Sequence, residues 1–287
     1  MTDSRISFGV ADLGDVRLHY AKAGSGARLV VLLHGFPEFW YSWRWQLVDL
    51  SDAYTVVAPD MRGYNLSDKP QGVGAYKVEL LAKDIAKLIK ELGYSSAAIV
   101  GHDWGASVVW SIASHNPEVA WKVVALQVPP PQVMKRNMSL RQLAASWYMF
   151  FFQLPWLPEL ILKSRDYRML ENALRTSTVQ PNVFDDSDIA AYKEGWRLGS
   201  LTSMLNCYRA NVFSGLFSKQ KTSDRISVPS LFIYGEQDQA IIPDTVKGVG
   251  DHIDAPYVEH RIPRSGHWVQ QEAADEITNV IREFLAD

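Results

Sequence analysis

The chain has 287 residues, of which 47% are hydrophobic, and its 29 basic and 32 acidic side chains give a formal net charge of −3. This composition supports a large buried core and excludes a disordered chain, and without a strongly basic cluster it predicts no binding to nucleic acid or to a membrane. The single cysteine, Cys207, excludes an intramolecular disulfide. The N-terminus does not resemble a leader peptide, and no apolar run approaches the ~20 residues that a membrane span needs. We therefore expect a cytoplasmic protein.

Short apolar runs alternate with amphipathic stretches along most of the chain. This order predicts an α/β fold with a mostly parallel central sheet flanked by helices. The expected strands are Leu29–Leu33, Tyr54–Ala58, Ala97–Val100, Lys122–Leu126, Ser230–Tyr234 and Tyr257–Ile262. The expected helices are Leu80–Leu92, Ala106–His115 and about Ala273–Leu285. The first of these carries apolar side chains at the spacing of one helical face.

The middle of the chain departs from this alternation. Three consecutive prolines, Pro129-Pro130-Pro131, break regular structure. The residues that follow are rich in aromatic side chains, have the texture of helices and contain no convincing strand. We therefore expect a helical cap domain, residues 129–218, inserted into a core domain made of residues 1–128 and 219–287.

The segment Gly101-His102-Asp103-Trp104-Gly105 lies between an expected strand and an expected helix. The pattern small-x-nucleophile-x-small is typical of a sharp strand-to-helix turn that lifts the central side chain above the sheet. Esterases and lipases carry Ser at this position, whereas Asp, with an ordinary pKa of ~3.9, is already ionised at neutral pH. Asp103 could attack an sp3 carbon that carries a leaving group, an epoxide oxygen or a halide, and form an ester that water must then hydrolyse. The alternative is that Asp103 only caps the following helix.

Two later residues complete a possible triad. In the α/β-hydrolase fold the order along the chain is nucleophile, acid, histidine, and Asp103, Asp238 and His267 obey it. Asp238 would orient the imidazole of His267, which would deprotonate the attacking water. Glu236 is the rival for the acid, and His34 and His102 are expected to shape loops through hydrogen bonds. The oxyanion hole would use the backbone N–H groups of Phe36 and Trp104.

With these motifs the sequence resembles the soluble epoxide hydrolases of the α/β-hydrolase fold, in the branch with an aspartate nucleophile. The matching pieces, in the expected order, are His34-Gly-Phe-Pro-Glu38, Asp60-Met-Arg-Gly-Tyr-Asn-Leu-Ser-Asp68, Gly101-His-Asp-Trp-Gly105, Gly235-Glu-Gln-Asp238 and Gly266-His267. The resemblance implies two cap tyrosines that hold and protonate the epoxide oxygen, which would be Tyr148 and Tyr208. Ala210 interrupts the more usual Tyr-Arg-Asn at the second position.

The combined expectation is an epoxide hydrolase that converts an epoxide and water to a vicinal diol without a metal or organic cofactor. Phe36, Trp104, Tyr148 and Tyr208 would contact the substrate. A haloalkane dehalogenase is the first alternative, in which the Trp104 indole would be one halide donor and a cap tryptophan the second: Trp147, Trp156 or Trp196. Phe36 stands where many dehalogenases carry Asn. A ligand-binding protein without catalysis is the second alternative.

Overall fold

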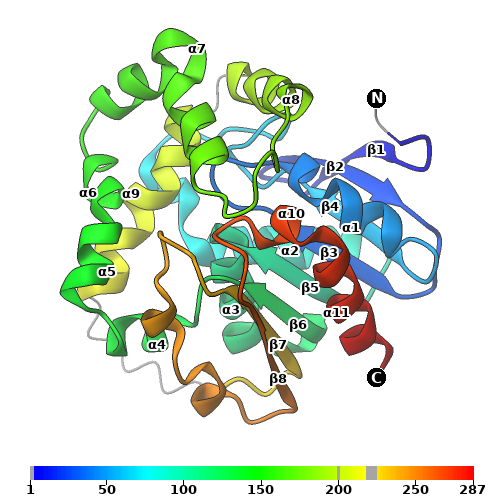
Figure 1. Ribbon diagram of the computed structural model, residues 1–287. Coiled ribbons are helices and arrows are strands. Elements are labelled where there is room, and N and C mark those ends of the chain that lie inside the picture. The colour runs from blue at the N-terminus through cyan, green and yellow to red at the C-terminus, as the bar shows by residue number, and fades with distance from the viewer. Residues whose placement is uncertain (1–2, 199–200, 218–224) are drawn as a thin grey trace.

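The computed structural model describes residues 3–198, 201–217 and 225–287. Eight strands form one sheet in the order β1-β2-β4-β3-β5-β6-β7-β8 (Figure 1). The pairs β1–β2 and β2–β4 are antiparallel and the other neighbours are parallel. The strands are β1 Ser7–Asp12, β2 Arg17–Ala23, β3 Leu29–Leu33, β4 Thr55–Pro59, β5 Ala97–His102, β6 Ala120–Leu126, β7 Ser230–Gly235 and β8 Tyr257–Ile262.

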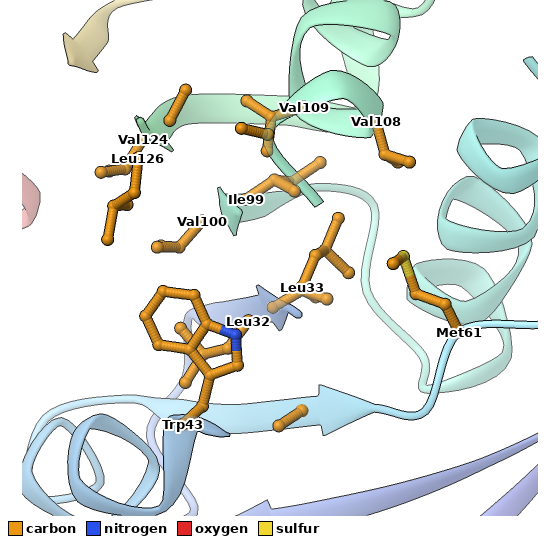
Figure 2. Close-up of a cluster of buried hydrophobic side chains, with 14 of the residues drawn as sticks. Leu32, Leu33, Trp43, Met61, Ile99, Val100, Val108, Val109, Val124 and Leu126 are labelled. Atoms are coloured by element: carbon orange, nitrogen blue, oxygen red, sulfur yellow. The ribbon is translucent and has the colours of Figure 1, made fainter. Parts of the chain in front are cut away.

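The central strands are buried on both faces, as expected for parallel strands covered by helices. β3, β4, β5 and β7 contain no exposed residue. Leu32 pairs with Val100, and Val31 pairs with Ile99, so the two pairs point to opposite faces of the sheet. Figure 2 shows Trp43 beside Leu32 and Val100, and the α3 side chains above Ile99.

Helices of the core pack in pairs, α1 with α11 and α2 with α3. The core helices are α1 Arg44–Asp49, α2 Val78–Glu91, α3 Trp104–His115, α10 Val269–Glu272 and α11 Ala274–Ala286. Short 3-10 helices cover Trp40–Trp43, Val73–Tyr76, Pro117–Val119, Pro243–Val246 and Val249–His252. Among the described residues, no helix is long and apolar enough to cross a membrane.

A run of helices separates β6 from β7, and the described residues of this run contain no strand. The helices are α4 Pro131–Arg136, α5 Leu140–Ala145, α6 Trp147–Phe151, α7 Leu157–Thr176, α8 Asp186–Arg197 and α9 Leu201–Phe217. α7 is interrupted by non-helical backbone at residues 164–167. Figure 1 shows these helices gathered at one side of the molecule, away from the C-terminus. The division into core and cap domains stays a prediction, and its second boundary, at 218/219, falls outside the described residues.

The expected α/β architecture with a mostly parallel sheet flanked by helices is confirmed, with each expected strand and helix present to within a few residues. The antiparallel strands β1 and β2 were not expected from the sequence. β1 lies at the sheet edge, where Phe8 and Val10 are exposed. Its apolar residues therefore do not form the continuous buried run that marks the central strands.

Candidate active site

Asp103 occupies the sharp turn between β5 and α3. Its backbone has φ 53° and ψ −118°, a conformation that costs free energy for a residue with a side chain and that the surrounding structure must enforce. Two glycines permit the turn: a Cβ on Gly101 would overlap the backbone of Gly105, and a Cβ on Gly105 would overlap the carbonyl of Leu33. The expected strand–turn–helix geometry is therefore present, and the side chain of Asp103 stands at the carboxyl end of a central strand.

The loop after β3 holds one oxygen of the Asp103 carboxylate. The backbone N–H of Phe36 donates to Asp103 Oδ1 at 2.8 Å. Gly35 makes this approach possible, because a Cβ there would overlap the Asp103 side chain. Trp104 is the first residue of α3, and its N–H has no partner within the helix because it lies in the first turn. Of the two expected oxyanion donors, Phe36 thus lies in the loop after β3, and Trp104 lies at the start of α3, next to Asp103 in the chain.

His267 lies between two carboxylates. Its Nδ1 is 2.8 Å from Asp238 Oδ2, and its Nε2 is 3.7 Å from Asp103 Oδ2. The second oxygen of Asp238 accepts the backbone N–H groups of Ala240, at 2.7 Å, and Ile241, at 3.0 Å. Glu236, the alternative acid, is exposed, so the carboxylate that contacts His267 is that of Asp238.

The electrostatics of the three residues are coupled. Burial alone would raise the pKa of Asp103, but the His267 imidazole, His102 and the N–H of Phe36 hold the pKa of this carboxyl below its ordinary value. Burial alone would lower the pKa of His267, but the carboxylates of Asp238 and Asp103 raise it well above the ordinary histidine range. The site therefore favours an ionised Asp103 beside a protonated His267.

Two tyrosines from the inserted helices face this centre. The Tyr208 ring, on α9, lies edge-on to Trp104 at 5.0 Å and to Phe36 at 5.3 Å between ring centroids. The Tyr148 ring, on α6, lies 6.1 Å from that of Tyr208. Burial and then the charge of Asp103 raise the pKa of both hydroxyls above the ordinary tyrosine value. Both tyrosines therefore stay protonated at neutral pH and can donate a hydrogen bond.

The tryptophans considered as second halide donors lie elsewhere. The side chains of Trp147 and Trp156 are 56% and 68% exposed. The Trp196 indole donates its N–H to the carbonyl of Pro37 at 2.7 Å. Of the four tryptophans considered, only Trp104 adjoins the carboxylate.

A second carboxylate–histidine pair lies behind the site, and the sequence motifs did not reveal its role. Glu38 is 1% exposed, and its Oε2 lies 3.1 Å from His102 Nδ1. His102 Nε2 donates to the backbone carbonyl of His267 at 2.8 Å. Glu38 also accepts the amide of Gln271 at 2.9 Å. His102 thus supports the His267 backbone, which agrees with the structural role expected for it.

His34 also matches the expectation that it shapes a loop. Its Nε2 accepts the backbone N–H of Met61 at 3.0 Å, so its Nδ1 carries the proton and donates to the carbonyl of Gly35 at 2.9 Å. In the described parts of the chain, no three His, Cys, Asp or Glu side chains gather as a metal site.

Gln127 links the loops of the acid and the base, and nothing in the sequence pointed to it. It is 1% exposed and has a left-handed backbone, with φ 69°. Its Oε1 accepts the N–H of Gly235 at 3.0 Å, and its Nε2 donates to the carbonyl of Gly266. One side chain therefore ties the strand end before Asp238 to the residue before His267.

Comparisons with known proteins agree with this geometry. Residues 28–274 match the family described as alpha/beta hydrolase fold. The chain is 40% identical to AB hydrolase superfamily protein YfhM of Bacillus subtilis (strain 168), over 94% of each chain. It is 37% identical to Epoxide hydrolase 3 of Mus musculus, over 99% of this chain and 77% of that one.

A solved structure gives the same result. The crystal structure of Bacillus megaterium epoxide hydrolase in complex with an inhibitor superposes with a TM-score of 0.90 at 33% identity, covering 98% of this chain and 100% of that one. The chain belongs to the α/β hydrolase fold family and, within it, to the epoxide hydrolases.

Proposed function

We propose that this protein converts an epoxide and water to a vicinal diol through a covalent ester on Asp103. The observation that carries the proposal is the placement of a carboxylate with a depressed pKa opposite two protonated tyrosines, with the Asp238–His267 pair beside it. A carboxylate nucleophile suits an electrophilic sp3 carbon, and the tyrosines suit an oxygen that gains negative charge as the ring opens.

In the first half-reaction, an oxygen of Asp103 forms a bond to one epoxide carbon while the bond from that carbon to the ring oxygen breaks. Tyr148 or Tyr208 transfers its proton to the oxygen, leaving a tyrosinate and a hydroxyalkyl ester. The rings of the two tyrosines lie 6.1 Å apart, and that of Tyr208 lies 5.0 Å from the ring of Trp104, the residue after Asp103. The raised pKa of the tyrosines keeps the donors in their acid form before the reaction.

Alkylation prepares the second half-reaction. Once Asp103 is an ester, its negative charge is gone and only the Asp238 carboxylate still supports the protonated form of His267. The pKa of His267 falls because one of the two charges that raised it has been removed. His267 then releases its proton, which passes through solvent to the tyrosinate, and becomes a base at the moment when water must be activated.

In the second half-reaction, His267 Nε2 takes a proton from water and the resulting hydroxide bonds to the carbonyl carbon of the Asp103 ester. The N–H groups of Phe36 and Trp104 stabilise the tetrahedral oxyanion. When the ester bond breaks, the departing oxygen takes the proton from His267. Asp103 is left as an acid, and the proton that it loses on ionising returns to His267, which restores the protonated imidazole of the resting site.

The test uses purified protein with styrene oxide and, in parallel, 1-bromobutane, measuring diol and bromide beside an Asp103→Ala control. We expect diol without bromide and loss of diol in the control. A single turnover in ¹⁸O-labelled water then places the label in Asp103, because water attacks the ester carbonyl; label only in the diol contradicts the covalent route. Bromide without diol replaces the proposal with a dehalogenase.

A further inference from the structure

Glu272 is the last residue of α10, and its carboxylate lies against the backbone on both sides of His267. Its Oε1 accepts the N–H of Gly266 at 3.0 Å and that of Trp268 at 3.3 Å, and its Oε2 lies 3.1 Å from the same Gly266 nitrogen. Hydrogen bonds to a carboxylate are stronger than those between neutral groups. We call residues 264–268 the base loop. One side chain therefore holds this loop before and after the histidine.

The same carboxylate also holds a segment of the inserted helical region. Residues 177–180 lie between α7 and α8, and the N–H of Val179 donates to Glu272 Oε2 at 2.8 Å. In the same place the indole of Trp268 donates to Ser177 Oγ at 2.7 Å. The segment therefore packs directly on the base loop, and Glu272 accepts hydrogen bonds from both.

The backbone around His267 has two sets of partners. Its carbonyl groups are held by the core: Gln127 donates to the carbonyl of Gly266, and His102 donates to that of His267 at 2.8 Å. The N–H groups of the two residues that flank the histidine are instead donated to Glu272. Without this carboxylate both N–H groups lose their acceptor, and the peptide planes beside the histidine are then free to rotate.

We propose that Glu272 is a positioning residue for the second half-reaction, because it fixes the backbone that carries the His267 imidazole. This role rests on the proposed function, in which the histidine acts as a base only after the ester on Asp103 has formed. His267 Nε2 lies 3.7 Å from Asp103 Oδ2. A displacement of the base loop therefore changes the geometry in which water is deprotonated beside the ester, and such displacements slow a reaction strongly.

The alternative is that Glu272 only caps α10. Trp268 precedes this short helix, and a side chain that accepts its N–H stabilises the first turn. In that case the loss of Glu272 lowers the free energy of unfolding but leaves the ratio of the two half-reactions unchanged, because only the folded fraction falls. The two roles therefore differ in the kinetics that they predict.

The experiment follows both half-reactions in single turnovers of the purified full chain with styrene oxide, using rapid quenching and the mass of the intact protein. Glu272→Ala should slow ester hydrolysis by about tenfold, as expected for a misplaced base, and leave alkylation of Asp103 within about twofold of the wild type. Glu272→Gln keeps one acceptor oxygen, so it should slow hydrolysis only a few-fold. Asp275→Asn is the matched control: it removes an exposed carboxylate from the first turn of α11 and should behave as the wild type does.

Hydrogen exchange, read by mass spectrometry, tests the contacts without any reaction. In Glu272→Ala, exchange should rise in two separate peptides, one that contains the base loop and one that contains residues 177–180, because each loses the acceptor of its N–H groups. Asp275→Asn should leave both peptides unchanged. Circular dichroism checks that each variant is folded, and if Glu272→Ala does not fold, Glu272→Gln carries the same comparison.

Three results overturn the proposal: a Glu272→Ala variant that hydrolyses the ester as fast as the wild type, one that slows both half-reactions to the same degree, or one whose base loop exchanges no faster. Failure of the proposed function gives a different result, because the wild type itself then forms no ester on Asp103. That result removes the kinetic role of Glu272 as well, while the exchange data still report whether its carboxylate joins the two segments.

Discussion

On the sheet side of the candidate site, called the core side below, each proposed reacting group is placed by a turn that follows a strand. On the side of the helices inserted between β6 and β7, called the cap side below, the proposed groups are placed by packing between helices. Asp103, Asp238 and His267 follow β5, β7 and β8, and backbone N–H groups and glycines fix their surroundings. Tyr148 and Tyr208 sit among aromatic rings on α6 and α9. The first side is held by short hydrogen bonds, and the second by contacts that are individually weak.

This difference suggests a division of labour. In the proposed mechanism Asp238 and His267 act in hydrolysis of the ester, Asp103 acts in both half-reactions, and the two tyrosines act only while the epoxide ring opens. Substitutions on the two sides should therefore affect different half-reactions, which transient kinetics can separate.

The largest expected effect follows from replacing the base. His267→Gln keeps a polar side chain of similar reach but cannot accept a proton, so turnover should fall by about 10³-fold, within the range for loss of a general base. Asp103 can still be alkylated, so one equivalent of ester should accumulate and appear in the mass of the intact protein. An unmodified protein after incubation with substrate would show that His267 is needed before the ester forms.

Removing the cap hydroxyls should give the opposite kinetic pattern. Tyr148→Phe and Tyr208→Phe keep the rings that pack against Phe152 but remove a proton donor, so each should slow alkylation by about 10²-fold. Ester hydrolysis should be unchanged within about twofold once the ester has formed. Tyr192→Phe, a buried cap tyrosine whose hydroxyl faces Gln271 at 3.0 Å, is the matched control. If it slows alkylation equally, the effect is one of packing.

The pH dependence should also divide the two half-reactions. The pKa of Asp103 is held below its ordinary value, so alkylation should persist into acid. Hydrolysis needs neutral His267, so it should fall about tenfold for each pH unit below the pKa of His267 in the ester. Stopped-flow mixing at mildly acid pH should therefore show a burst of alkylation followed by slow turnover. Equal acid limits for both phases would contradict the assigned base.

The sequence predicted the core side well because its signals are local. The glycines around Asp103 and the loops before Asp238 and His267 follow strands that apolar runs mark clearly, and the turn geometry follows from the spacing. The two cap tyrosines were predicted only from the resemblance to epoxide hydrolases, because aromatic residues in helices are equally suited to packing. Glu38 and Gln127 act through contacts between segments distant in the chain, and no local pattern marks such contacts.

The smallest expected effects come from replacing two buried glutamines, Gln127 on the core side of the site and Gln142 on the cap side. Gln127 joins the acid and base loops, and Gln142 joins α5 to the loop after β7, accepting the N–H of Ile242 at 3.0 Å and donating to Ala240. Replacing either with Leu leaves buried backbone groups unpaired, so both variants should lose about 1–3 kcal/mol of unfolding free energy in denaturant titrations.

Their kinetics should differ although their losses of stability match. Gln127→Leu displaces Gly235 and Gly266 together, so ester hydrolysis should slow by about tenfold with little change in alkylation. A tenfold loss of rate corresponds to an increase of about 1.4 kcal/mol in the activation free energy of hydrolysis. Gln142→Leu loosens the helices that carry Tyr148, so alkylation should slow a few-fold while hydrolysis is retained. Equal slowing of both phases in both variants would mean that the two sides of the site move as one unit, and the division between turn-placed and packing-placed groups would then have no kinetic meaning.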